Sequence, residues 1–285
     1  MILRSPVKWF GGKGKMLKAI LPLIPHDHVY VEPFAGGANI LLNREPSAIE
    51  VLNDLHRGIV NLFRVLQSTR KSKELAELLR NTLYSRAEFE RAIAICSGSE
   101  AGGEVCRAWA MIVETRQGFG GKALVTGNWS RVRERTSTAK SFRHATAKDV
   151  IDRLRDRLRY TYVECRDALS VMRFHAATNS VIYADPPYVA AARSSGGYDH
   201  EMDDAQHVAF IDCALSLPGA IVVSGYDSPL YRPLRKAGWK LTRFDVVTSA
   251  TNTVRLPRTE CVWQNPRAVE LIKAARSSTA EARMR

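Results

Sequence analysis

The sequence is poor in cysteine, and its cysteines follow no pairing pattern. There are five, an odd number, and none of them are spaced as C-x-x-C. A disulfide framework and a zinc site are therefore not expected, and a reducing cytoplasm is the predicted compartment. The sequence also lacks an apolar run long enough to span a membrane, and its start lacks the apolar segment of a signal peptide. We therefore expect no membrane partner.

Acidic residues are scarce relative to basic ones. The 285 residues include 42 lysines and arginines against 29 aspartates and glutamates, which gives a formal net charge of +13. This surplus indicates a polyanionic partner, although charge alone does not separate DNA from RNA or from an acidic membrane surface. Hydrophobic residues make up 45% of the chain, which is typical of a globular protein with a substantial core.

The most informative motif is Asp185-Pro186-Pro187-Tyr188. It follows the apolar run Ser180–Ala184, which indicates a buried parallel strand. The two prolines cannot continue a sheet, so they predict a rigid corner at the carboxyl end of the strand, where open α/β sheets bind ligands. The carboxylate and a proline carbonyl can accept both N–H bonds of an exocyclic amino group, and the ring can stack on a base. The plainer alternative is a strand-ending turn with a capping aspartate.

A second strand, from residue 29, runs into Glu32-Pro33-Phe34-Ala35-Gly36-Gly37 and then a predicted helix at Ile40–Asn43. The glycines allow a sharp turn and a close ligand. Their spacing differs from G-x-G-x-x-G, so no pyrophosphate cradle is expected. About twenty residues later a strand ends in Asn53-Asp54, where an acid holds ribose hydroxyls in nucleotide-type folds. An acid near an adenosine ribose without a phosphate cradle indicates S-adenosylmethionine.

A third motif, Val7–Lys13, combines aromatic residues, two glycines and a lysine near the amino terminus. Lys13 can pair with the carboxylate of the cofactor's methionine part, and Trp9 can cover its apolar part. The alternative is a flexible basic amino terminus. Two exposed aromatics would serve no purpose there, which favours the binding interpretation.

Together these motifs resemble the Dam-like, D12 class DNA adenine-N6 methyltransferases. The resemblance rests on Lys8–Lys13, Glu32–Gly37, Asn53-Asp54 and Asp185–Tyr188, and it covers about residues 5 to 266. The later runs Ser224–Tyr231 and Arg258–Asn265 look like the phage and prophage branch, which includes members of restriction-modification systems. One departure is Gly36-Gly37-Ala38, where many relatives have Gly-x-Gly.

The resemblance implies S-adenosyl-L-methionine as cofactor and a set of site residues. An acid corresponding to Asp167 approaches the cofactor's adenine in the family. The candidate catalytic residues are Asp185, Pro186, Pro187 and Tyr188. The candidate cofactor-binding residues are Trp9, Lys13, Glu32, Phe34, Gly36, Asp54, Asp167 and Asp185. No metal is expected.

The positive charge is concentrated between Arg107 and Arg159, with thirteen Lys/Arg against five Asp/Glu. Within this segment basic residues alternate with hydroxyls, which suits phosphate contacts, and arginines can read guanine edges. For any single arginine a solvated surface is the plainer interpretation. The candidate residues for binding double-stranded DNA are Arg116, Lys122, Arg131, Arg133, Arg135 and Lys140.

The order of the predicted elements indicates an α/β fold, a doubly wound Rossmann-like methyltransferase sheet with an inserted, mostly helical DNA-recognition domain. The sheet is expected to be mainly parallel, with room for one reversed strand at its end. Residues 1–55 and 160–266 are predicted to form a discontinuous catalytic domain, and residues 56–159 the insert. Residues 267–285 are expected to be a basic tail, loosely helical or disordered.

Local patterns predict two helix starts. Ser85 precedes Glu88, which resembles a capping box. His200, Asp203, Asp204 and His207 are metal ligands by type, but we favour a loop entering a helix with Asp203 as the N-cap. Methyl transfer from a sulfonium needs no metal.

The expected function is transfer of a methyl group from S-adenosylmethionine to adenine N6 of DNA after base flipping, at specific or relaxed sites. A cytosine-N4 methyltransferase typically has Ser-Pro-Pro-Tyr, and RNA base methyltransferases more often have Asn-Pro-Pro. A catalytically idle DNA-binding protein is the third alternative, against which the intact Lys13, Asp54 and Asp185 argue. We expect a monomer or weak dimer.

Overall fold

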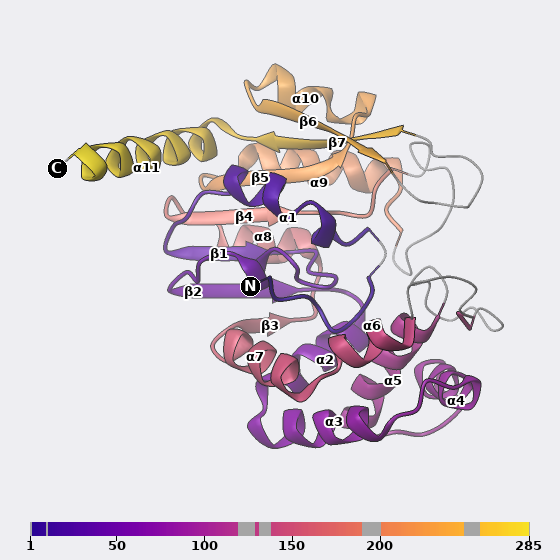
Figure 1. Cartoon of the computed structure of the whole chain (residues 1–285). Helices are drawn as coiled ribbons and strands as arrows, with labels where there is room; N and C mark the ends of the chain where they lie inside the picture. Colours follow the sequence, from indigo (N-terminus) through magenta and orange to yellow (C-terminus); the bar gives the residue numbers. More distant parts are fainter. Residues whose placement is uncertain are drawn as a thin grey trace. The chain divides into compact units, whose positions relative to one another are not determined.

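The structure is a computed structural model that describes residues 2–9, 11–118, 129–130, 138–189, 201–247 and 257–284. The chain forms two compact units, each built from three segments (Figure 1). The helical unit comprises Met1–Leu17, Ala35–Arg44 and Asp54–Cys165, and the sheet unit comprises Lys18–Phe34, Glu45–Asn53 and Arg166–Arg285. The amino-terminal motif and the glycine turn thus group with the predicted insert.

The strands of the sheet unit follow the order β2-β1-β4-β5-β7-β6. β1, β2, β4 and β5 pair in parallel, and β7 is antiparallel to both of its neighbours. The sheet confirms the predicted Rossmann-like α/β class. The reversed strand is present, but β6 pairs along its outer side, so it lies one place in from the edge. The strands are β1 (Val29–Glu32), β2 (Ile49–Asn53), β4 (Ser180–Ala184), β5 (Ala220–Tyr226), β6 (Lys240–Val247) and β7 (Pro257–Gln264).

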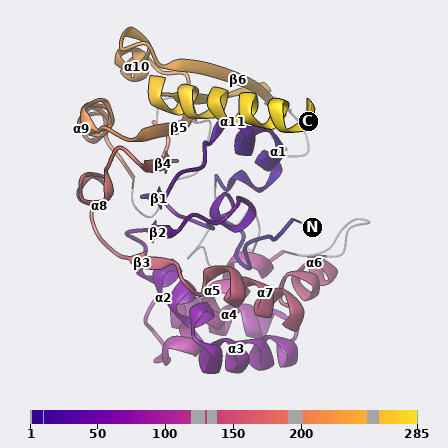
Figure 2. The same ribbon diagram turned by 90° about the vertical axis from the view of Figure 1, so that its left-hand side faces the viewer.

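The central strands of this sheet are apolar because both of their faces are covered. Every residue of β4 is buried, as the run before Asp185 predicted. Figure 2 shows α8 and α9 along one face of the sheet and α11 on the opposite side. The helices of this unit are α8 (Ala168–His175), α9 (Asp204–Ser216), α10 (Arg232–Lys236) and α11 (Pro266–Met284), and the short α1 (Leu17–Ile20) precedes β1.

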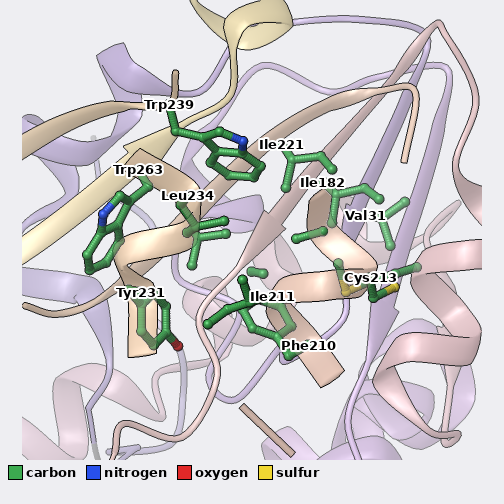
Figure 3. Packing of buried hydrophobic residues seen from close by; sticks show 14 of the residues in the cluster. Val31, Ile182, Phe210, Ile211, Cys213, Ile221, Tyr231, Leu234, Trp239 and Trp263 are labelled. Atoms are coloured by element: carbon green, nitrogen blue, oxygen red, sulfur yellow. The ribbon is translucent and has the colours of Figure 1, made fainter. Parts of the chain in front are cut away.

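One hydrophobic core joins the sheet to its helices. Val31, Ile182 and Ile221 from three neighbouring strands pack with Phe210 and Ile211 from α9 (Figure 3). Burying an aliphatic side chain of this size contributes about 1.5 to 3 kcal/mol relative to leaving it exposed. The core therefore holds β4 in place, and the predicted catalytic motif begins where this strand ends.

The helical unit is an assembly of amphipathic helices, in line with the mostly helical insert that the sequence predicted. Ile59, Leu62, Phe63 and Leu66 are all buried on one face of the first long helix. The elements are α2 (Arg57–Gln67), α3 (Thr69–Asn81), α4 (Arg86–Cys96), α5 (Glu104–Gln117), α6 (Thr138–Ala145), α7 (Lys148–Leu158) and the short strand β3 (Tyr162–Glu164).

Both predicted helix starts are confirmed. The Ser85 side chain accepts a hydrogen bond from the Glu88 N–H at the start of α4. The Asp203 side chain accepts one from the Gln206 N–H, and the Gln206 side chain bonds back to the Asp203 N–H as a capping box. Short polar side chains stabilise these starts because the first N–H groups of a helix have no partner within the helix.

One expectation about secondary structure is corrected. The segment Ile40–Asn43 does not begin an α-helix but forms the 3-10 turn Leu41–Asn43. Of the two alternatives for the tail beyond residue 266, the helical one is present as α11, anchored where Ala268 is buried. Because α11 follows the carboxyl end of the antiparallel β7, it starts at the sheet edge opposite the corner after β4. No helix in the described ranges is both long and apolar enough to cross a bilayer.

Candidate active site

The predicted corner lies where β4 ends between the parallel strands β1 and β5. Asp185 is partly exposed, Pro186 is buried and Pro187 is partly exposed. The prolines end the strand because they cannot donate to the ladder. The corner thus holds a carboxylate partly open to solvent, beside backbone carbonyls on a rigid segment.

Tyr188 is held from two directions. It is only 5% exposed, and its hydroxyl donates a hydrogen bond to the Glu260 carboxylate on β7. Its ring meets that of Tyr226 edge to face, with centroids 4.5 Å apart. Burial, then the charges of Asp185 and Glu260, raise the pKa of Tyr188 well above its usual value. The hydroxyl therefore stays protonated at neutral pH and acts as a donor.

A second buried tyrosine lies behind the corner. The Tyr183 hydroxyl and that of Ser224 on β5 are 2.8 Å apart, within hydrogen-bond distance. Its pKa is raised well above the usual value, first by burial and then by Asp185, with smaller effects from Glu32 and Glu260. The negative charges of these three carboxylates thus all favour the protonated form of the Tyr183 hydroxyl. The sheet unit concentrates negative charge at the carboxyl end of β4.

Two further cofactor candidates end or follow β1 in the sheet unit. Glu32 is buried and accepts a hydrogen bond of 2.8 Å from the Tyr30 hydroxyl. The Phe34 ring packs edge to face against Phe210 of α9, with centroids 5.8 Å apart. Each has a clear structural contact, and its binding role stays a prediction.

Asp167 lies outside the core. It is exposed and caps α8, accepting hydrogen bonds from the backbone N–H and the hydroxyl of Ser170 at 2.8 and 2.9 Å. The approach of this acid to an adenine ring stays a prediction.

Asn53 has a structural role that its sequence motif did not predict. Its side chain is fully buried and donates to the carbonyls of Pro33 and Arg166 at 2.9 and 3.0 Å. It also accepts from the Arg166 N–H at 2.9 Å. One amide therefore joins the segments that follow β1 and precede α8. The sequence signal for this role was a polar residue at the end of a buried strand, directly before Asp54, where an apolar residue would be expected.

In the helical unit, Asp54 fixes the glycine turn. One carboxylate oxygen accepts from the Gly36 N–H at 2.8 Å, and the other accepts from the His56 N–H at 2.9 Å. Gly36 has φ = +46°, and a Cβ added there would lie 2.6 Å from Cδ1 of Trp9. The turn therefore needs glycine for both its backbone conformation and its close contact with the indole.

Lys13 is buried although it is a lysine. It is 6% exposed, and its ammonium donates to the Gly11 carbonyl at 3.1 Å. A buried ammonium is costly unless it is paired, and it can donate three hydrogen bonds. Lys13, the Trp9 ring and the glycine turn are chemically suited to a ligand with a carboxylate and an apolar part.

Arg116 has a different place from the one that its sequence position suggested. Its guanidinium donates to the carbonyl of Pro6 at 2.7 Å and to that of Ser5. Burial, and less so Arg4, lower its pKa to about 10, so it remains positively charged at neutral pH. These contacts direct the guanidinium at the chain's own backbone, and we do not retain Arg116 as a base-reading residue.

Lys140 is exposed on α6, a helix anchored by the fully buried Phe142 and without an acidic residue. This placement leaves phosphate contact by Lys140 as a prediction. The other four DNA-binding candidates lie outside the described residues: Lys122, Arg131, Arg133 and Arg135.

Two of the four residues that are metal ligands by type have structural roles. Asp203 caps α9, and His207 is fully buried with its Nδ1 3.2 Å from the Tyr231 hydroxyl. His200 lies outside the described residues. Within those residues no group of three or more His, Cys, Asp or Glu side chains is arranged to hold a metal ion.

The comparison with protein families agrees with the geometry. The model of the D12 class N6 adenine-specific DNA methyltransferases matches residues 9–237, which include the glycine turn and the corner after β4. The chain belongs to this family. The reaction of the class is the transfer of a methyl group to adenine N6 in DNA.

Individual relatives come from bacteria and a phage. The chain is 26% identical over 252 residues to the type II methyltransferase M1.LlaDCHI of Lactococcus lactis subsp. cremoris, covering 82% of this chain and 85% of that protein. It is 24% identical over 247 residues to the DNA N-6-adenine-methyltransferase of Escherichia phage P1, covering 81% and 31%. It is 37% identical over 67 residues to the modification methylase StsI of Streptococcus sanguinis, covering 23% and 10%. The chain thus spans most of the first relative and a third or less of the other two.

Proposed function

We propose that this chain methylates adenine N6 in double-stranded DNA with S-adenosyl-L-methionine as the donor, at specific or relaxed sites. The observation that carries the proposal is the partly exposed Asp185 carboxylate on the rigid corner after β4. The family match supplies the reaction class.

The chemistry of the target amine explains what the corner does. The N6 lone pair is delocalised into the adenine ring, so the nitrogen is a weak nucleophile. Asp185 accepts one N6–H and the Pro186 carbonyl accepts the other, which localises the lone pair on nitrogen. When bound, the cofactor supplies an electrophilic methyl group on its sulfonium. Orientation by fixed acceptors provides much of the remaining rate enhancement.

The target atom is inaccessible inside a duplex, so the base must leave the stack. The Tyr188 ring is almost fully covered in this structure, whereas Tyr226 beside it is partly exposed. Stacking of Tyr188 on a flipped base therefore requires neighbouring side chains to move.

Each unit, taken by itself, contains residues that are proposed to bind the cofactor. Buried Lys13 supports this role in the helical unit, because its ammonium can bind a carboxylate. The proposed set in the helical unit is Trp9, Lys13, Gly36 and Asp54. The proposed set in the sheet unit is Glu32, Phe34, Asp167 and Asp185.

DNA affinity is assigned to the basic segment of the helical unit, in which Lys140 on α6 is the retained candidate that the structure describes. The proposed setting is the cytoplasm of a bacterial cell or a phage-infected host, in line with the sources of the relatives. A monomer or weak dimer is proposed.

The first prediction tests Asp185. Purified protein is incubated with labelled S-adenosylmethionine and unmethylated DNA, and the nucleosides are analysed. Asp185→Ala is expected to lower transfer by about 10²- to 10⁴-fold, because the amine loses its charged acceptor. DNA affinity should change less than threefold, roughly 0.7 kcal/mol.

Asp212→Ala serves as the matched control, since this exposed aspartate lies on α9 away from the corner. It should retain full transfer. Label on cytosine or on RNA alone would reject adenine-N6 methylation of DNA. Equal loss of binding and transfer in Asp185→Ala would reject the role given to Asp185.

A further inference from the structure

Glu260 is a buried acid whose position on β7 is set by the antiparallel ladder. The ladder pairs it with Tyr226 on β5 and with Phe244 on β6. It is only 7% exposed, although it belongs to one of the residue types least often buried. A buried carboxylate at this point therefore calls for a specific reason.

The reason lies in the contact with Tyr188. A carboxylate can only accept hydrogen bonds when ionised, and the neutral Tyr188 hydroxyl is a donor aimed at it. Bonds with one charged partner are stronger than neutral ones, and burial raises the cost of breaking them. The acid and the hydroxyl thus stabilise one another in a place where either alone would be unfavourable.

The contact also fixes the ring of Tyr188. Its hydroxyl donates a hydrogen bond to Glu260 on β7, and its ring packs edge to face with that of Tyr226 at the end of β5. The backbone of Tyr188 continues directly from Pro187 and the corner. The Tyr188 ring is thus held at its hydroxyl end by β7 and at its side by β5. Because this residue follows the corner directly, its fixed ring restrains the segment that carries Asp185.

We propose that Glu260 is a positioning residue for methyl transfer, which sets the place of Tyr188 and through it the acceptors at the corner. The inference rests on the proposed role of Asp185 and Tyr188. Glu260 acts without touching the base. The length of the Glu260 side chain matters, because the shorter side chain of an aspartate at the same position would not reach the Tyr188 hydroxyl.

The test uses four variants of the full chain: Glu260→Gln, Glu260→Asp, Tyr188→Phe and the double variant Glu260→Gln with Tyr188→Phe. The rate constant kcat, the KM for DNA and the Kd for S-adenosylmethionine are measured for each. Glu260→Asp and Tyr188→Phe are expected to lower kcat by about 10- to 100-fold, the range of a charge-assisted hydrogen bond. KM and Kd should change less than threefold, within roughly 0.7 kcal/mol.

Two results separate positioning from general stability. Glu260→Gln keeps an acceptor oxygen, so it should retain more kcat than Glu260→Asp. The double variant should be no slower than Tyr188→Phe alone, because both changes remove the same contact. Asp245→Asn on β6, an exposed acid, is the control and should retain the parental kcat.

The inference would be overturned if the loss of kcat in the double variant equalled the product of the losses in the two single variants. An unchanged kcat in Glu260→Asp with only a lower Tm would also overturn it. If Asp185→Ala is inactive while the Glu260 variants are fully active, the positioning role alone is wrong. If Asp185→Ala itself remains active, the proposed function of the corner is wrong.

Discussion

The chain leaves two neighbouring parallel strands by turns of opposite kinds. After β1 it passes through glycines, and after β4 it passes through two prolines. The glycine turn depends on the absence of a side chain at Gly36 and on the hydrogen bond that the Gly36 N–H donates to Asp54, 18 residues later. The proline corner depends on covalent rings and on a hydrogen bond from Tyr188 to Glu260, 72 residues away.

The two turns represent two ways of holding a loop at the carboxyl ends of the strands, where ligands bind. A glycine turn is flexible by composition and acquires its shape from contacts, so an added methyl group or a lost acceptor should disrupt it. A proline corner has its shape before folding, so the loss of one ring should cost little. The same class of substitution should therefore have unequal effects at the two sites.

The largest effect on stability is expected for Gly36→Ala. The new Cβ would lie 2.6 Å from Cδ1 of Trp9, and alanine would be forced to φ = +46°. Strain and overpacking together should lower the free energy of unfolding by about 2 to 4 kcal/mol. Urea unfolding measures this change.

Two matched variants isolate the indole contact. Gly36→Ala in a Trp9→Ala background should cost only about 1 to 2 kcal/mol, because the backbone strain remains and the overlap does not. Ala38, at φ = +51°, already accepts the same strain without such an overlap. An equal cost in both backgrounds would show that Trp9 does not constrain the turn.

A smaller effect is expected for Asp54→Asn. The amide keeps one oxygen acceptor and loses the other, so either Gly36 N–H or His56 N–H loses its bond. The expected loss is about 1 to 3 kcal/mol, measured by urea unfolding. Asp27→Asn is the control, because this partly exposed side chain accepts a hydrogen bond from the His28 N–H, which one remaining oxygen can preserve. Equal effects in the two variants would contradict the role of Asp54.

The smallest effect is expected for Pro186→Ala. The carbonyl that would accept N6–H is retained, and the backbone geometry is held by Pro187 and Tyr188. Stability should fall by about 0.4 to 1 kcal/mol, mainly because the unfolded chain gains freedom. Unfolding and kcat are measured together, and kcat should stay within about threefold. A loss as large as that of Gly36→Ala would remove the contrast between the two turns.

Features encoded within a few residues could be predicted from the sequence. The apolar run before Asp185 predicted a buried strand, and Asp203 predicted the start of α9, because burial and capping act locally. The positive φ of Gly36 likewise follows from its place in a turn.

Contacts between distant segments could not be predicted in this way. Arg116 was assigned to DNA from its charge, yet it binds the carbonyls of Ser5 and Pro6 more than a hundred residues earlier. Glu260 lay in a recognised motif, but its contact with Tyr188 depends on the register of β7 beside β5. Register is decided by packing across the whole sheet, which a single sequence does not display.

The Tyr188–Glu260 contact also has a consequence for the order of synthesis. A ribosome adds about 5 to 20 residues per second, so Glu260 is made roughly 4 to 14 seconds after Tyr188. Until then a nascent chain contains the acid and both prolines of the corner but lacks the carboxylate that restrains its tyrosine. We expect modification of DNA to begin only once the last strand has been translated and inserted beside β5, so that interrupted translation yields inactive fragments.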